Sequence, residues 1–481
     1  MRRKSKLVGV LRPILILCLL SALLLLASCV YKPVAPAEKD EILANITSEE
    51  NAEYDYNYVT SYLRVWRLPS FNSDKLKWAE LVFANYFNLS SGMPDVLKHA
   101  QDTATAFMET YYDNIDITDK ATVTDALLDC YVTAVGDPYS IYRTPEVFDD
   151  YNTDMSGKFG GIGVVVEYNH TDETIMVASV YKDSPAEAAG IRVGDFIHAV
   201  EGKTVEEIGY LNVVYLIRGE IGTDVQITVK RAEELIDTVA TRAEVVEKTV
   251  EYEITEDGYG YIAVTGFKEN TDEQFAEALS YMKYEGVKGI VFDMRNNPGG
   301  YVDTVCFMVS CLVPGGTRII SYQYKGQSEQ ILVAPSTDNI PVWTDDGPLL
   351  DENGEVVYEQ YDMTMWVPVT VICNEYTASA GEIFVAAIRD YTTDGLIVSE
   401  IVGNVTFGKG IMQSTFMYRH NGTQDGSSIT LTVAYYNPPC GENYHLSGVT
   451  PNHIIENTET EDLQYDKAFE VLENLVNANN N

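Results

Sequence analysis

The stretch Val367–Val402, with the sequence VPVTVICNEYTASAGEIFVAAIRDYTTDGLIVSEIV, decides the fold of this chain. Its first part, Val367–Cys373, is an apolar run rich in β-branched residues and predicts a buried strand. The apolar run Gly381–Ile388 predicts a buried helix, and Leu396–Val402 predicts a second strand after it. Two buried strands separated by a helix are typical of a parallel βαβ unit.

The same alternation begins earlier in the chain, from Tyr259 onward. Strands are predicted at Tyr261–Val264 and Gly289–Met294, and helices at Asp272–Tyr284 and Val302–Leu312. This β-α-β-α order indicates an α/β core with largely parallel strands.

A serine and a lysine near this core have the surroundings that hydrolysis needs. Ser379 directly precedes the buried helix, where backbone N–H groups and the helix dipole favour an oxyanion. Lys409 stands between Gly408 and Gly410, which let the backbone crowd around the amine and exclude water. Because lysine accepts a proton only when neutral, its pKa must fall from about 10.4 by desolvation. Gln413, four residues later, is on the same face and is placed to orient the amine. These residues predict a Ser/Lys peptidase.

Both motifs also have simpler interpretations. Ser379 and Glu382 have the spacing of a capping box, in which the serine only caps the helix. The run from Gly403 to Lys409 is close to a phosphate-binding loop, but Gly410 stands where that loop needs Ser or Thr for magnesium. The missing hydroxyl excludes nucleotide binding at this loop.

From the Gly-Asp-Pro-Tyr turn at 136–139 to the Gly-Val-Thr-Pro-Asn run at 448–452, the chain resembles the C-terminal processing peptidases, also called tail-specific proteases. The resemblance implies that Ser379 is the nucleophile, Lys409 the general base and Gln413 the support of that base. It also implies a crotonase-like fold for the α/β core, and it leaves no role for a metal or a cofactor.

The run Asp293–Gly300 resembles the oxyanion-hole loop of that family. By this resemblance the N–H of Gly299 or of Gly300, together with that of Ala380, faces the tetrahedral intermediate. Without the resemblance, Asn-Pro-Gly-Gly is equally typical of a plain strand-to-helix turn.

Two positions depart from the family. The serine-to-lysine spacing is a few residues longer, and we expect a polar loop around Tyr391–Gly395 to absorb the excess. Asn452 stands where the family usually has Asp, outside the catalytic set.

The residues from Ser156 to Arg242 form a smaller module of strands with one short capped helix, and this combination resembles a PDZ domain. PDZ domains take up a peptide as an added strand and hold its terminal carboxylate on backbone N–H groups. The loop of Gly160, Gly161, Ile162 and Gly163 would supply those groups. Arg218 either links peptide occupancy to the active site, as the family implies, or satisfies the carbonyls at a helix end.

The N-terminus determines the expected compartment. A basic start and an apolar run from Ile14 to Leu26 precede Leu-Ala-Ser-Cys, which predicts a signal peptide and a lipid on Cys29. The alternative is an uncleaved membrane span, since the run is near the lower length limit for one. We therefore expect an extracytoplasmic lipoprotein anchored in a bacterial cell membrane.

The expected organisation follows from these segments. The predicted parts are a lipoprotein signal at 1–28, a tether at 29–52, an N-terminal helical region at 53–150, a PDZ domain at 156–245 and an α/β serine peptidase core at 246–460 with an insertion or cap at 323–365.

The composition limits the kinds of partner that this chain is expected to bind. With 33 basic and 72 acidic residues the net charge is −39, which disfavours nucleic acid and anionic headgroups as partners. The cysteines and six histidines show no metal-binding spacing. The expected partners are polypeptides with free apolar C-terminal tails, and the oligomeric state stays open. The alternatives are a catalytically silent PDZ scaffold and, less favoured outside the cytoplasm, an acyl-CoA enzyme.

Overall fold

The computed structural model describes residues 71–87, 102–103, 106–107, 109–112, 114–169, 173–232, 234–335, 340–344, 347–359, 367–420, 423–458 and 460–479. The predicted signal peptide at 1–28, the predicted lipid acceptor Cys29 and the tether at 29–52 lie outside these residues. Within them, no helix is long and apolar enough to cross a membrane. The same residues contain no cluster of His, Cys, Asp and Glu that could hold a metal ion.

The core is a six-stranded sheet with the order β10-β11-β12-β19-β20-β23. Its strands are β10 (Val250–Ile254), β11 (Gly260–Val264), β12 (Ile290–Asp293), β19 (Val369–Cys373), β20 (Ser399–Gly403) and β23 (His453–Ile454). From β11 to β23 the neighbours are parallel, and β10 is antiparallel to β11. Every residue of β12 and β19 is buried, which explains why their sequences are mainly apolar. The predicted parallel α/β order is confirmed.

Helices cover both faces of this sheet. The helices α10 (Thr271–Glu285), α11 (Val302–Ser310) and α12 (Ala380–Thr393) share one apolar cluster with it, and α13 (Leu463–Asn479) packs on the opposite face. The polar loop expected from Tyr391 is wrong, because α12 continues to Thr393. The Tyr391 side chain is buried and its hydroxyl donates to the Arg318 carbonyl at 2.8 Å, so the extra turn packs into the core.

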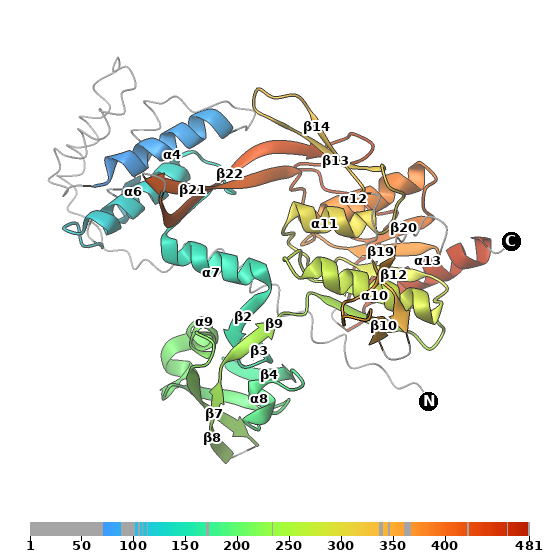
Figure 1. The fold of residues 1–481 in the computed structure, drawn as a ribbon, viewed down its shortest axis with the longest axis horizontal. Helices are drawn as coiled ribbons and strands as arrows, with labels where there is room; N and C mark the ends of the chain where they lie inside the picture. Colours follow the sequence, from blue (N-terminus) through green and yellow to red (C-terminus); the bar gives the residue numbers. More distant parts are fainter. Residues whose placement is uncertain are drawn as a thin grey trace.

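Periodicity did not predict a second sheet, which joins the core to the N-terminal helices. Its strands are β1 (Ile141–Arg143), β13 (Arg318–Tyr324), β14 (Gln330–Val333), β21 (Ile411–His420) and β22 (Thr423–Asn437). Figure 1 shows β22 running from α4 (Ser73–Tyr86) and α6 (Lys120–Ala134) at one end to the core at the other. Apolar residues of β22 pack in the cluster of α4 and α6, whereas Tyr436 near its end belongs to the core cluster.

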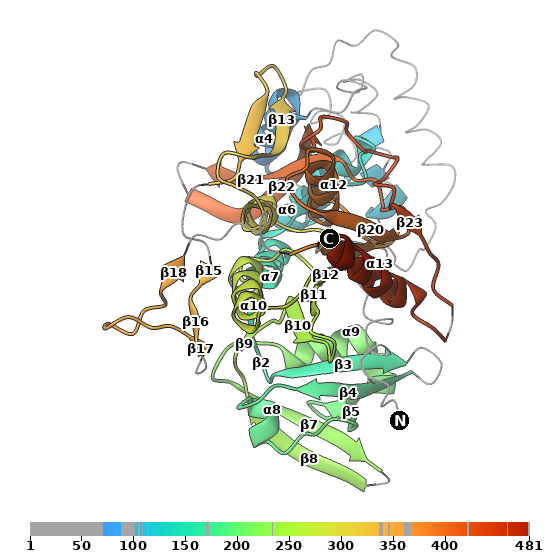
Figure 2. The same cartoon turned by 90° about the vertical axis from the view of Figure 1, so that its right-hand side faces the viewer.

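The segment 323–365, predicted as an insertion or cap, is only partly irregular. Its first residues continue β13 and then form β14, which returns antiparallel to β13, so the interpretation as a loop is wrong there. Beyond them, the short strands β15 (Ile340–Pro341), β16 (Trp343–Thr344), β17 (Gly347–Pro348) and β18 (Tyr358–Glu359) form two small sheets beside α10, as Figure 2 shows.

The module after residue 156 has its own sheet and its own apolar cluster. Its elements are β3 (Val164–Asn169), β4 (Thr174–Val180), α8 (Pro185–Ala188), β5 (Phe196–Val200), β6 (Lys203–Thr204), α9 (Val205–Ile217), β7 (Asp224–Arg231) and β8 (Glu234–Thr241). The predicted short helix is α8, with Ser184 as its N-cap and proline at its first position. The chain enters from α7 (Pro145–Ser156) through β2 (Lys158–Gly161) and leaves through β9 (Ala243–Val246), and these two strands pair with each other (Figure 1).

Candidate active site

Ser379 lies on a strained turn between β19 and α12. Its φ of 53° and ψ of −117° are an unusual backbone conformation for a residue with a side chain, of a kind that persists only where the surroundings enforce it. The side chain is half-buried. A sharp strand-turn-helix connection of this type is how several hydrolases present a nucleophilic serine.

Hydrogen bonds from the neighbouring loop hold this turn in place. The strands β12 and β19 are parallel with Asp293 beside Ile372, so the loops that follow them emerge side by side. The Thr377 hydroxyl donates to the Met294 carbonyl at 2.7 Å, and the Ala378 N–H donates to the Asn297 carbonyl at 2.9 Å. The serine turn and the predicted oxyanion loop are therefore one connected unit.

The two glycines of that loop differ in what their N–H groups do. Gly299 has a φ of 105°, and a Cβ built there would come within 2.7 Å of the Ser379 Cβ, so only glycine fits. The N–H of Gly299 donates to Asn297 Oδ1 at 2.9 Å. Among the residues that the structure describes, the N–H groups of Gly300 and Ala380 have no hydrogen-bond partner.

Lys409 follows the core strand β20 on a turn with Gly408 at a φ of 90°. Its Nζ lies 4.7 Å from the ring centroid of Tyr139, in the Gly-Asp-Pro-Tyr turn. Burial lowers the pKa of the Lys409 amine, and the charges of Asp137 and Glu382 oppose this effect only in part. The amine therefore has the direction of pKa shift that a lysine base requires.

Glu382, one turn into α12, connects the serine to the lysine. Its side chain is fully buried, and its Oε2 accepts the N–H of Ser379 at 3.0 Å and the N–H of Lys409 at 2.7 Å. Its Oε1 accepts the N–H of Gly408 and the hydroxyl of Thr406, each at 2.6 Å. Burial raises the pKa of this carboxyl group, and the four hydrogen bonds oppose the rise.

The capping-box interpretation of Ser379 accounts for only part of this arrangement. The Glu382 carboxylate makes the capping bond to the Ser379 N–H, and the same oxygen also accepts the N–H of Lys409. The sequence pattern indicated that Glu382 caps the helix, and it did not predict the hydrogen bond of Glu382 to the backbone N–H of Lys409. The available signal was a lone carboxylate at the start of an otherwise apolar run.

In the part of the chain that the structure describes, no hydrogen bond shows either of two predicted contacts of the Lys409 amine. One is the contact with the Ser379 hydroxyl, and catalytic hydrogen bonds of this kind often form only when substrate is bound. Gln413 lies in β21 just after a bulge, and its buried Nε2 has no partner among the described residues. Its support of Lys409 stays a prediction.

One of the six histidines lies beside the lysine turn. The N–H of Leu446, the next residue after His445, donates to the Gly408 carbonyl at 2.8 Å, and burial lowers the pKa of the His445 imidazole. Its backbone also packs against Gly410, where a Cβ would come within 2.8 Å of the His445 nitrogen. His445 is therefore the histidine to test as a rival base.

The predicted peptide-binding loop is less open than the sequence indicated. Gly160 and Gly161 lie in β2 and pair with β9, and the Gly160 carbonyl accepts the N–H of Gly219 at 3.0 Å. Ile162 is buried in the core of the module, and Gly163 has a φ of 77°. Binding of a peptide carboxylate by these residues stays a prediction.

Arg218 directly follows α9, but it does not satisfy the carbonyls of that helix. Arg242 does so instead, through donation to the carbonyls of Leu216 at 2.7 Å and Ile217 at 3.0 Å. The guanidinium of Arg218 stacks on the Phe159 ring at 4.1 Å and lies 3.9 Å from an Asp154 oxygen. Of the two interpretations of Arg218, the helix-end one is wrong, because its side chain points toward α7.

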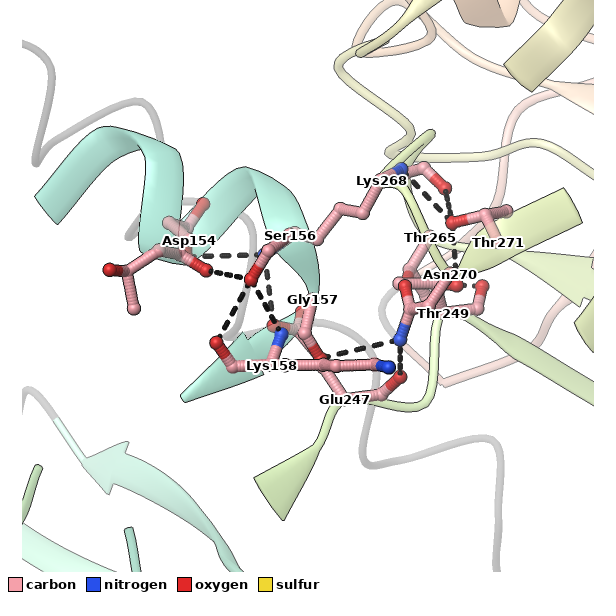
Figure 3. Close-up of polar contacts among 12 residues, drawn as sticks. Asp154, Ser156, Gly157, Lys158, Glu247, Thr249, Thr265, Lys268, Asn270 and Thr271 are labelled. Atoms are coloured by element: carbon pink, nitrogen blue, oxygen red, sulfur yellow. Dashed lines mark hydrogen bonds and ion pairs between the residues drawn. The ribbon is translucent and has the colours of Figure 1, made fainter. Parts of the chain in front are cut away.

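Both linkers of the module meet at the N-terminal end of α10 (Figure 3). Asn270 Nδ2 donates to the carbonyls of Gly157 at 3.3 Å and Glu247 at 2.9 Å. Lys268 Nζ lies 3.1 Å from Asp154 and 2.9 Å from the Glu247 carboxylate. We call this set the linker junction.

Known protein families match both the core and the smaller module of this chain. The sequence profile of peptidase family S41 matches residues 258–455, and that of the PDZ domain matches residues 176–231. The carboxy-terminal processing protease CtpA of Bacillus subtilis (strain 168) is 31% identical over 349 residues, which cover 72% of this chain and 67% of that protein. The chain belongs to peptidase family S41. The predicted fold class, an α/β peptidase core with a PDZ domain and N-terminal helices, is confirmed for this S41 chain.

A second relative of this S41 chain is also matched over only part of its length. A probable CtpA-like serine protease of Staphylococcus haemolyticus (strain JCSC1435) is 32% identical over 355 residues, or 73% of this chain and 64% of that protein. The chain thus spans just under two thirds of the length of that relative. The solved photosystem II D1 C-terminal processing protease is 23% identical, with coverage of 83% of this chain and 96% of that one and a TM-score of 0.43.

Proposed function

We propose that this chain is a serine endopeptidase that cleaves polypeptides near their C-terminal tails. One observation carries the proposal: the strained Ser379 turn is joined through Glu382 to Lys409, and burial favours the neutral amine of that lysine. A serine hydroxyl next to a neutral amine is a nucleophile with its base. The name of the Bacillus subtilis relative, a carboxy-terminal processing protease, supports the preference for tails.

The proposed reaction has two halves. Ser379 Oγ attacks the scissile carbonyl carbon while Lys409 Nζ takes the hydroxyl proton, and the ammonium then gives that proton to the leaving amine. Deacylation by water, with Lys409 again as base, releases the second product and restores the serine. Of the two glycines, Gly300 is the better oxyanion donor with Ala380, because the Gly299 N–H already donates to Asn297.

The PDZ domain suggests the substrate of this activity, and the N-terminal sequence suggests its location. We infer that the PDZ domain binds the apolar C-terminal tail of a polypeptide, with a free carboxylate at the loop Gly160–Gly163. We also propose that lipid on Cys29 anchors the protein on the outer side of a bacterial membrane. Replacement of Cys29 by serine should move the protein from the membrane fraction to the supernatant, and retention in the membrane would contradict the anchor.

The direct test compares the full-length chain in detergent with its Ser379→Ala variant. A peptide with an apolar free C-terminus and a fluorophosphonate probe are offered to both. The wild type should cut the peptide and take up the probe, and Ser379→Ala should do neither. Equal cleavage by both forms would contradict the assignment of the nucleophile, and a wild type that binds the peptide without cleavage or labelling would favour the silent PDZ scaffold.

A further inference from the structure

The hydroxyl of Tyr436 lies between the backbones of the proposed nucleophile and base. Tyr436 is the second-last residue of β22 and is 1% exposed. Its hydroxyl oxygen is 2.7 Å from the carbonyl oxygen of Lys409 and 3.1 Å from that of Ser379. A strand of the second sheet thus reaches both residues of the site from outside the βαβ unit.

A second tyrosine directs the proton of this hydroxyl. The hydroxyl of Tyr444 donates to the Tyr436 oxygen at 3.1 Å, so the Tyr436 proton is left for the two carbonyl groups. Burial raises the pKa of Tyr436, with the hydrogen bond from Tyr444 in opposition, and it raises the pKa of Tyr444 well above its usual value. Both phenols therefore stay protonated, and Tyr436 stays a donor, at any pH at which a protease works.

Tyr436 and Glu382 bind different backbone groups of the same two residues, Ser379 and Lys409. Glu382 Oε2 accepts the N–H groups of Ser379 and Lys409, and the Tyr436 hydroxyl donates to their carbonyl groups. One acceptor and one donor thus fix both backbones relative to each other. No hydrogen bond between the side chains of Ser379 and Lys409 does this among the described residues.

We propose that Tyr436 is a positioning residue, which sets the distance and direction from the Lys409 amine to the Ser379 hydroxyl through their carbonyl groups. The proposal rests on the proposed Ser/Lys peptidase activity. Misplacement of reacting groups by about 1 Å typically costs about 100-fold in rate, even when the substituted residue never touches the substrate. Loss of this hydroxyl should therefore lower kcat and leave KM unchanged.

The alternative is that Tyr436 is only a well-packed core residue, and Tyr391 provides the matched control. Tyr391 is also 1% exposed, lies in the same apolar cluster and donates through its hydroxyl to a backbone carbonyl, that of Arg318. Among the described residues its hydroxyl has no hydrogen bond with Ser379 or Lys409, so Tyr391→Phe removes an equivalent hydrogen bond away from the site.

The experiment measures kcat and KM of the full-length wild type, Tyr436→Phe and Tyr391→Phe on the tail peptide. Rates are expressed per fluorophosphonate-titrated serine, which counts folded sites only, and thermal midpoints are recorded. We expect the kcat of Tyr436→Phe to fall about 10- to 100-fold, with KM within about twofold of wild type. Tyr391→Phe should lower the thermal midpoint by a similar amount but keep kcat within about threefold of wild type.

Two outcomes would contradict the proposals, and the experiment tells them apart. An active wild type with equal kcat in Tyr436→Phe and Tyr391→Phe would overturn the positioning role alone. A wild type that neither cleaves nor takes up the probe would overturn the proposed function, and the positioning role with it.

Discussion

The site around Ser379 and Lys409 and the linker junction of the PDZ domain are both held by polar contacts, but these contacts have opposite characters. In the site, Glu382 and Tyr436 are fully or almost fully buried and bind backbone groups. In the junction, Lys268 is 16% exposed and pairs with Asp154, which is 49% exposed. Buried hydrogen bonds to backbone fix one geometry, whereas partly exposed ion pairs contribute little and are screened by salt.

This difference indicates which part of the molecule can move. The site has a strained residue that its surroundings must hold rigid, as catalysis by proximity requires. The junction joins the PDZ domain to the core by a two-stranded ribbon, one buried amide at Asn270 and the ion pairs of Lys268. We therefore expect substitutions in the site to change the rate of chemistry, and substitutions in the junction to change the attachment of the PDZ domain.

Among the substitutions that compare the site with the junction, the largest effect is expected from Glu382→Gln. The amide can accept on one side only, so its NH₂ group faces backbone N–H groups that the carboxylate now satisfies. Cleavage should fall at least about 100-fold, and the free energy of unfolding should fall by about 3 kcal/mol. Peptide kinetics and denaturant unfolding measure the two losses.

Glu375→Gln is the control for Glu382→Gln. It makes the same change on an exposed side chain of the neighbouring loop, which accepts a hydrogen bond from Asn404 at 3.1 Å. Its unfolding free energy should stay within about 0.5 kcal/mol of wild type. If Glu382→Gln behaved like this control, the carboxylate would not be what joins Ser379 to Lys409.

A smaller effect is expected from Asn270→Ala, which leaves the carbonyls of Gly157 and Glu247 without this donor. Stability should fall by about 2 kcal/mol, and the linkers should become sensitive to trypsin. Labelling of the serine by fluorophosphonate should stay within about threefold of wild type. A loss of labelling as large as that of Glu382→Gln would show that the junction and the site are one rigid unit.

The smallest effect is expected from Lys268→Met, which removes the ion pairs with Asp154 and Glu247 and keeps the apolar stem. The cost should stay below about 1 kcal/mol, and the thermal midpoint should become less dependent on salt. Lys467→Met, which breaks the exposed pair with Glu470, is the comparison. A cost above about 2 kcal/mol would mean that the junction is held as firmly as the site.

Much of the core could be predicted because its signals are local. The strands β12 and β19 are buried and mainly apolar, and the helices α10, α11 and α12 beside them have the expected period, so the βαβ order around Ser379 follows from the sequence. The predicted end of α12 was wrong because Tyr391, Thr392 and Thr393 look like a polar turn until Tyr391 is seen packed beside Arg318.

The contacts that connect the site were beyond local reasoning. Tyr436 meets Ser379 across 57 positions of sequence, and it does so at the end of a hairpin that periodicity did not predict. Arg242 closes α9 across 25 positions, which is why the nearer Arg218 was considered for that role. Such pairings depend on which distant strands lie together, and short-range patterns carry no information about that.

We propose that a neutral Lys409 activates Ser379, and the pH dependence of kcat/KM is the sharpest test of this mechanism. Because burial lowers the pKa of Lys409 and the neutral amine is the active form, activity should rise with pH and level off below the usual lysine pKa of about 10.4. Lys409→Arg, which stays protonated, should lose at least about 1,000-fold at every pH. A rise with a midpoint at or below about 6.5 that persists in Lys409→Arg would contradict the claim and point to His445 as the base.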